Sequence, residues 1–178
     1  MTTNGKLVWL DLETTGLDPQ KDKIVEISTV ITDSFLNVLA EGPDLVIHYP
    51  PTINSEMSDW SREHFAMSGL LDAIHESTVS LQDAEKQTLD FIKEYCPQKT
   101  ALLAGSSVHF DKEFLRRYMS KIVEYVHYRI IDVSTIKELA ERWYPDMPRN
   151  IKVERHRAHD DILESIDELK YYKAHMFK

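Results

Sequence analysis

The sequence is poor in cysteine and contains no long apolar run. Cys96 is the single cysteine among 178 residues, so an internal disulfide and a zinc site built on thiolates are both excluded. No run of about eighteen apolar residues appears, and a membrane-spanning helix needs such a run. The first residues, MTTNGK, have neither the apolar core of a signal peptide nor the arginine-rich pattern of a transit peptide. We therefore expect a soluble cytoplasmic protein with no membrane partner, or a mitochondrial one if a transit segment was removed.

An excess of positive charge is also lacking. The 21 lysines and arginines are outnumbered by 30 aspartates and glutamates, which gives a formal net charge of −9. Proteins that hold long nucleic acids use basic surfaces, because affinity grows with the number of phosphates contacted. The charge therefore argues against a long duplex as ligand. It leaves open a ligand with one to a few phosphates, provided that metal ions neutralise the local site.

Repeats, low-complexity tracts and glycine-serine linkers are absent as well. With 178 residues, 42% of them apolar, the chain is long enough for one substantial core and short for two. We predict a single domain over residues 1–178.

Hydrophobic patterning predicts an α/β fold. Residues 7–11 are apolar on both faces, which is typical of a central strand. Two more strands, 24–32 and 38–47, follow as a meander before any long helix, and short strands are predicted at 100–104 and 128–132. Residues 147–155 read as a loop. We expect helices over residues 59–67, 70–75, 109–118, 134–143 and about 159–174, and one that begins at Ser80 and ends before Pro97.

Two carboxylates stand one residue apart at the end of the first strand. Strand side chains alternate between faces, so Asp11 and Glu13 project to the same side. They lie at the carboxyl end of the strand, where open α/β sheets gather their ligands. Acid pairs also occur by chance on solvated faces, but an apolar run before this pair and the Gly16 turn after it favour a functional site.

Further acids occupy similar corners of the chain. Asp111 follows the strand at 100–104 and begins the next helix, where helix capping is the alternative role. Asp161 lies at the entrance to the last helix, five residues after His156, and this spacing does not put the two on one helical face. Asp161 is therefore free to bind metal while His156 stays available, and Asp160 is the candidate for a cap or salt bridge.

Several carboxylates without thiols describe a site for a hard cation, Mg²⁺ or Mn²⁺. Zinc bound by His156, His159 and Asp160 is the alternative. A pair of hard cations clamps the attacking and leaving oxygens of a phosphodiester, and a histidine such as His156 is suited to take a proton from water. The residues thus predict metal-dependent phosphodiester hydrolysis.

The ordered set of motifs resembles a known family. Matches to the DEDD 3′-to-5′ exonucleases of the histidine subtype are Asp11, Glu13, Asp111 and the pair His156-x₄-Asp161. Within that superfamily, DLETTGLD, HYRIIDVSTIKELAERWYP and HRAHDDILESIDEL resemble the oligoribonuclease family over nearly the whole chain. The resemblance implies an RNase H-like mixed sheet, an antiparallel meander plus parallel strands flanked by helices. It also implies a 3′-to-5′ exoribonuclease that hydrolyses very short RNA, chiefly dinucleotides, to nucleoside 5′-monophosphates with two metal ions.

The same resemblance assigns substrate contacts. Leu17 and Trp60 are implied to wedge against the bases, and Ser107 is implied to cap the 5′-terminal phosphate together with Tyr128 and Arg129. In this family the last two act in trans, so a homodimer is expected. From the residues alone, Leu17 could be turn packing, Trp60 a core aromatic and the HYR segment an ordinary strand entry.

Two departures from the family pattern occur. Gly105-Ser106-Ser107 stands where the family has Gly-Asn-Ser, and Phe65 stands where it has a histidine, with His64 one position earlier. Two other functions stay open. A longer-substrate exonuclease, for DNA proofreading or RNA trimming, predicts a basic track that the sequence lacks. A non-catalytic nucleotide-binding scaffold predicts the loss of at least one acid or of the histidine.

Overall fold

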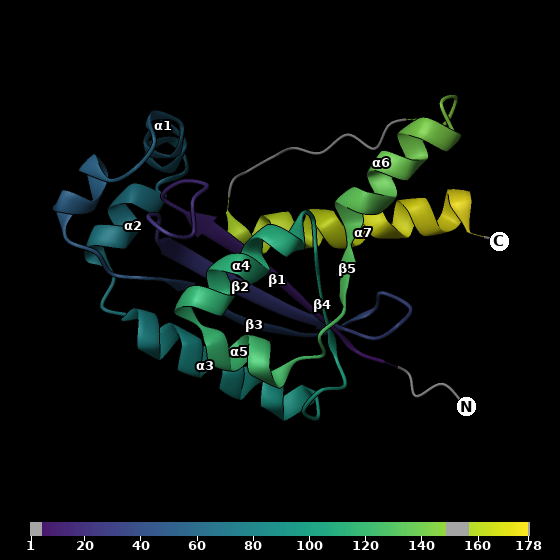
Figure 1. Ribbon diagram of the computed structural model, residues 1–178, viewed down its shortest axis with the longest axis horizontal. Helices are drawn as coiled ribbons and strands as arrows, with labels where there is room; N and C mark the ends of the chain where they lie inside the picture. Colours follow the sequence, from purple (N-terminus) through teal and green to yellow (C-terminus); the bar gives the residue numbers. More distant parts are fainter. Residues whose placement is uncertain (1–4, 149–156, 178) are drawn as a thin grey trace.

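The protein is described by a computed structural model that covers residues 5–148 and 157–177 (Figure 1). Its centre is a five-stranded sheet with the order β3-β2-β1-β4-β5. The antiparallel part consists of β1 (Leu7–Thr14), β2 (Ile24–Thr32) and β3 (Val38–Val46), and the short strands β4 (Leu102–Gly105) and β5 (Ile130–Asp132) run parallel to β1. The predicted mixed sheet is confirmed.

Helices cover both faces of this sheet. Apolar residues of β1 alternate: Val8 and Leu10 join the core beneath α3, α4 and α5, and Leu7 and Trp9 join the core beneath α6 and α7. In Figure 1, α1 and α2 lie together at one end of the molecule and α6 at the other. The helices are α1 (Asp59–Ser68), α2 (Leu70–Glu76), α3 (Leu81–Tyr95), α4 (Val108–Tyr118), α5 (Ser120–Tyr125), α6 (Val133–Trp143) and α7 (Ala158–Met176), with a 3₁₀ turn at Pro51–Ser55.

Most predicted elements are present with small changes at their ends. Ser80 caps α3 as predicted, because its side chain accepts a hydrogen bond from the backbone N–H of Asp83. The first strand continues to Thr14 instead of ending at residue 11, and α5 and the 3₁₀ turn were not predicted. Of the predicted loop at 147–155, residues 149–155 lie outside the described residues. Within the described ranges, the helices are too short or too polar to span a membrane.

Phe65, where the family pattern has histidine, is a core residue. It is fully buried in α1 and packs in a cluster with Val25, Ile53, Leu70 and Ile74. The neighbouring His64 instead stacks on Trp60, with ring centroids 4.0 Å apart. The departure at position 65 is therefore explained by packing, because an imidazole here would need a buried hydrogen-bond partner.

Truncating Phe65 tests this role. We expect Phe65→Ala to lower the free energy of unfolding by about 3–5 kcal/mol, since it removes a buried aromatic ring and leaves a cavity. Met67→Ala, on the same helix at a side chain that is 80% exposed, serves as the control and should change it little. Urea unfolding measures both variants, and equal stabilities for the two would contradict the assignment.

Candidate active site

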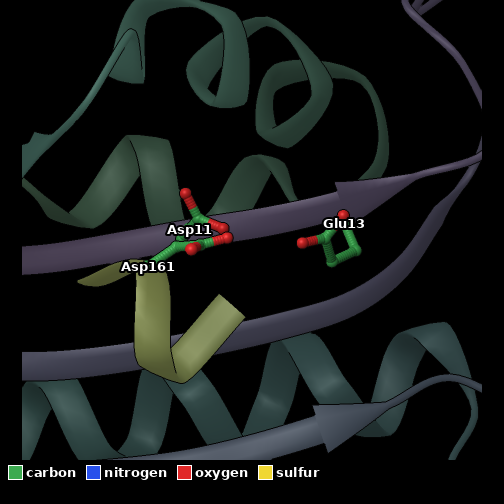
Figure 2. Close-up of side chains that lie close together, drawn as sticks. All are labelled: Asp11, Glu13 and Asp161. Atoms are coloured by element: carbon green, nitrogen blue, oxygen red, sulfur yellow. The ribbon is translucent and has the colours of Figure 1, made fainter. Parts of the chain in front are cut away.

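Three carboxylates meet at the carboxyl end of β1. Asp11 and Glu13 continue the face of the strand that Leu7 and Trp9 bury under α7, and Asp161 comes from the first turn of that helix. One oxygen from each of the three lies within 4.8 Å of the others. Figure 2 shows the carboxylates of Asp11 and Asp161 side by side, with Glu13 further along the strand. The structure thus brings together three of the four predicted metal ligands.

An ion pair with a buried glutamate fixes the position of α7 beside the carboxylates. Glu26 on β2 is fully buried and stands opposite Glu13 in the strand register. One of its oxygens accepts hydrogen bonds from Arg157 Nε and Nη2, at 2.9 and 2.7 Å, and the other accepts one from the backbone N–H of Ala158 at 3.0 Å. The helix that carries Asp161 is therefore anchored to the sheet at its first residue. Sequence reasoning missed both residues, although a glutamate within the apolar stretch at 24–32 is a signal for a buried pair.

Asp111 approaches the same strand from α4. Its side chain is buried, and Oδ1 accepts a hydrogen bond from the backbone N–H of Leu12 at 3.1 Å. This N–H is available because β4 pairs with β1 only from Leu7 to Trp9. The N-cap of α4 is Ser107, so Asp111 is not the capping residue that was its alternative. Asp111 is not among the three residues whose carboxylate oxygens lie within 4.8 Å of one another. Its role as a metal ligand stays a prediction.

Burial and mutual repulsion make these acids hard to ionise. Burial raises the pKa of Asp11 well above its usual range, and the charges of Asp111, Glu13 and Asp161 raise it further. The pKa of Glu13 is raised to about 8 by burial and then by Asp161. Burial also raises the pKa of Asp111 to about 7, against the opposing hydrogen bond from Leu12. A bound cation would favour the ionised forms.

The donor set fits a hard cation. The group of three offers carboxylate oxygens only, which Mg²⁺ and Mn²⁺ prefer over softer ligands. His159, part of the zinc alternative, has its Nε2 3.2 Å from Glu41 Oε2, and neither it nor Asp160 belongs to the group. His156 lies outside the described residues, so its predicted role as general base stays a prediction.

The two residues expected to contact bases are exposed. Leu17 and Trp60 are 81% and 54% accessible, which rules out the turn-packing and core-aromatic alternatives. Their segments adjoin, because the backbone N–H of Ser58 donates to the carbonyl of Thr15 at 3.0 Å. Both side chains therefore present apolar surface to solvent.

The residues expected at a phosphate lie around the starts of α4 and α6. Ser107 Oγ is 3.0 Å from Ser134 Oγ, a residue that sequence reasoning missed although it follows a strand in an Asp-x-Ser helix start. Tyr128 and Arg129 precede β5, so the predicted strand was too long at this end. Arg129 Nε donates to the Tyr128 hydroxyl at 3.1 Å, and the buried Lys112 donates to the Tyr128 carbonyl at 2.6 Å. Tyr128 itself is 71% accessible.

Comparisons with known proteins identify the fold and the family of this chain. A family model described as exonuclease matches residues 8–169. Exonuclease I from Methylocaldum szegediense superposes with a TM-score of 0.73 at 15% identity, over 98% of this chain and 41% of that chain. E. coli Exonuclease I in complex with a 5cy-dT13 oligonucleotide superposes with a TM-score of 0.70, also at 15% identity and over the same shares of the two chains. The chain spans about two fifths of these solved structures, and with them it has the RNase H-like fold of the exonucleases.

Relatives with higher sequence identity show which family of exonucleases the chain belongs to. The mitochondrial oligoribonuclease of Homo sapiens is 51% identical over 177 residues, 97% of this chain and 74% of that protein. The oligoribonuclease of Chromobacterium violaceum is 45% identical over 173 residues, 97% of this chain and 96% of that protein. The chain therefore belongs to the oligoribonuclease family of exonucleases, which are phosphodiester hydrolases.

The raised pKa of Glu13 predicts how stability depends on pH. In the metal-free protein Glu13 stays protonated up to about pH 8, whereas in the unfolded chain it ionises near 4.5. The unfolded state then binds fewer protons between these values, so the free energy of unfolding should fall as pH rises through this window. In Glu13→Gln that fall should be smaller, which denaturant unfolding in the presence of a chelator measures.

Glu63→Gln, on the exposed face of α1, is the matched control and should follow the unmodified protein. The assignment is wrong if the difference between Glu13→Gln and the unmodified protein is the same at pH 4.5 and pH 8.

Proposed function

We propose that this protein is a 3′-to-5′ exoribonuclease that hydrolyses very short oligoribonucleotides, chiefly dinucleotides, to nucleoside 5′-monophosphates. The observation that carries the proposal is the close approach of three carboxylates, those of Asp11, Glu13 and Asp161. They occur in a chain that belongs to the oligoribonuclease family. The net charge of −9 favours a substrate with few phosphates over a long duplex. The cytoplasmic location stays a prediction.

Four carboxylates, Asp11, Glu13, Asp111 and Asp161, would hold two divalent cations, Mg²⁺ or Mn²⁺. When bound, the cations supply positive charge that activates water and stabilises the charge developing on the scissile phosphate. His156 is the proposed general base, which takes the proton of the attacking water.

Leu17 and Trp60 are proposed to hold the two bases. Their exposure and the hydrogen bond between their segments support an apolar platform on which any base can stack. Ser107, with Ser134 beside it, is proposed to bind the 5′-terminal phosphate. Because a closed phosphate site leaves room for two nucleotides, a third base has to be displaced from it, and affinity for longer RNA should fall.

Tyr128 and Arg129 are proposed to complete the phosphate site of a partner subunit in a homodimer. The exposure of Tyr128 and the stacking of the Arg129 guanidinium, 5.5 Å from the ring centre, support a preformed pair at the surface. Lys112, on the same helix as Asp111, holds the carbonyl of Tyr128. An arginine fork beside a tyrosine hydroxyl suits a phosphate dianion.

A length series tests the proposed substrate. With Mn²⁺ or Mg²⁺ and RNAs of two to ten nucleotides, kcat/KM should be highest for the dinucleotide by a wide margin, because the site encloses two nucleotides. Excess chelator should abolish hydrolysis of every length. Equal kcat/KM for two-mers and ten-mers would favour the longer-substrate exonuclease, and full activity in chelator would exclude the metal mechanism. Time courses on 5′-labelled RNA measure both.

Subunit mixing tests the shared site. Asp111→Asn and Arg129→Ala should each be inactive, the first through its own metal site and the second through its partner's phosphate site. After subunit exchange, about half of the dimers are mixed, and one site in each then has an intact cluster and an intact cap. About a quarter of all sites should recover activity. Mixtures of Asp111→Asn with Asp11→Asn, two defects in one cluster, are the control and should stay inactive.

If Arg129 instead acts within its own subunit, every site keeps one defect. Exchanged mixtures that remain inactive would therefore refute the shared site, and the metal site would be unaffected by that result.

A further inference from the structure

We propose that Asp132 is the positioning residue of the phosphate site, because it holds the two serines, Ser107 and Ser134, in the arrangement that binds a 5′ phosphate. The inference rests on the proposed function, since it assigns a task to a residue beside the phosphate-binding serines. Asp132 acts through these neighbours and not by contact with the substrate.

The hydrogen bonds of Asp132 connect two helix starts. Asp132 is the last residue of β5 and the N-cap of α6, and its Oδ1 accepts hydrogen bonds from the backbone N–H groups of Ser134 at 3.1 Å and of Ser107 at 2.9 Å. Its Oδ2 lies 2.9 Å from Nδ1 of His109. Only 10% of its side chain is exposed. One carboxylate therefore ties the start of α4 to the start of α6.

Ser107 needs a hydrogen-bond acceptor such as Asp132 to hold its backbone in place. Its backbone is left-handed, with φ of 53° and ψ of 28°, a conformation that a residue with a Cβ adopts at an energetic cost. As the N-cap of α4 it makes no capping hydrogen bond with its own side chain, so its hydroxyl is directed to Ser134 Oγ, 3.0 Å away. The bond from its N–H to Asp132 offsets the strain, and the hydroxyl is kept for the ligand.

The carboxylate charge is compatible with a phosphate nearby. Asp132 sits between the N-termini of two helices, where backbone dipoles stabilise negative charge. Its oxygens are occupied by two backbone donors and an imidazole, so the groups left to face a phosphate are the hydroxyls of Ser107 and Ser134. Hydrogen bonding, and not charge, is therefore the property on which its task depends.

Two substitutions separate these properties. Asp132→Ser keeps a good N-cap for α6, but its shorter side chain does not reach Ser107. Asp132→Asn loses the charge and keeps an oxygen that both N–H groups can reach. Asp33→Ser is the matched control, because Asp33 likewise accepts hydrogen bonds from two backbone N–H groups, those of Phe35 and Asn37, in the β2–β3 turn.

The experiment compares one dinucleotide with and without its 5′ phosphate. We expect Asp132→Ser to lower kcat/KM for the 5′-phosphorylated form about tenfold, the contribution of one hydrogen bond to a charged group, through KM. The form without the phosphate should be unaffected, Asp132→Asn should retain the preference within about threefold, and Asp33→Ser should behave as the unmodified protein. Thermal unfolding checks that each variant is folded.

Equal losses of kcat/KM on both substrates, or no loss on either, would overturn the role of Asp132.

If Asp132→Ser does not fold, Asp132→Glu tests the same point, because it keeps the charge and displaces the carboxylate oxygens. Retention of the preference for the 5′-phosphorylated dinucleotide in that variant would also overturn the role. A protein without any preference for the 5′ phosphate would instead refute the phosphate site itself, and the role of Asp132 with it. Preserved preference in Asp132→Ser would refute Asp132 alone.

Discussion

Repulsion between carboxylates at the end of β1 is the constraint around which the site is organised. Asp11, Glu13 and Asp161 have oxygens within 4.8 Å of one another, in a region where burial already opposes ionisation. Such a group is unfavourable for the stability of the metal-free protein. Its presence in a chain of the oligoribonuclease family is explained if a divalent cation neutralises it. The fold then has to hold side chains that repel each other.

Two features of the structure provide this support. The buried pair of Glu26 and Arg157 anchors the first turn of α7 to β2, beside the strand that carries Asp11 and Glu13. On the other side of β1, the pairing with β4 ends at Trp9. Beyond that point Asp111 accepts a hydrogen bond from the backbone N–H of Leu12. Both features use a backbone N–H, that of Ala158 at the start of α7 and that of Leu12 within β1, to hold an acidic side chain in place. Removing Arg157 would leave the charge of Glu26 buried without its cationic partner, which is costly.

The sequence predicted the sheet and the carboxylates because their signals are local. The apolar run before Asp11, the alternation that puts Glu13 on the same face and the turn after them are all visible in one stretch. Glu26 and Ser134 were missed because their partners lie far away in the sequence, 131 residues for the bond to Arg157 and 27 for the bond to Ser107. Phe65 shows the same limit, since only the packing of α1 reveals that this position faces the core.

Proton release on metal binding tests the central claim most directly. Mn²⁺ is titrated calorimetrically into the metal-free protein at pH 7, in two buffers with different enthalpies of ionisation. Because the pKa of Glu13 is raised to about 8 in the metal-free protein, we expect metal binding to displace protons and the measured heat to differ between the two buffers. Binding with the same heat in both buffers, or no binding, would contradict the view that a cation neutralises these carboxylates.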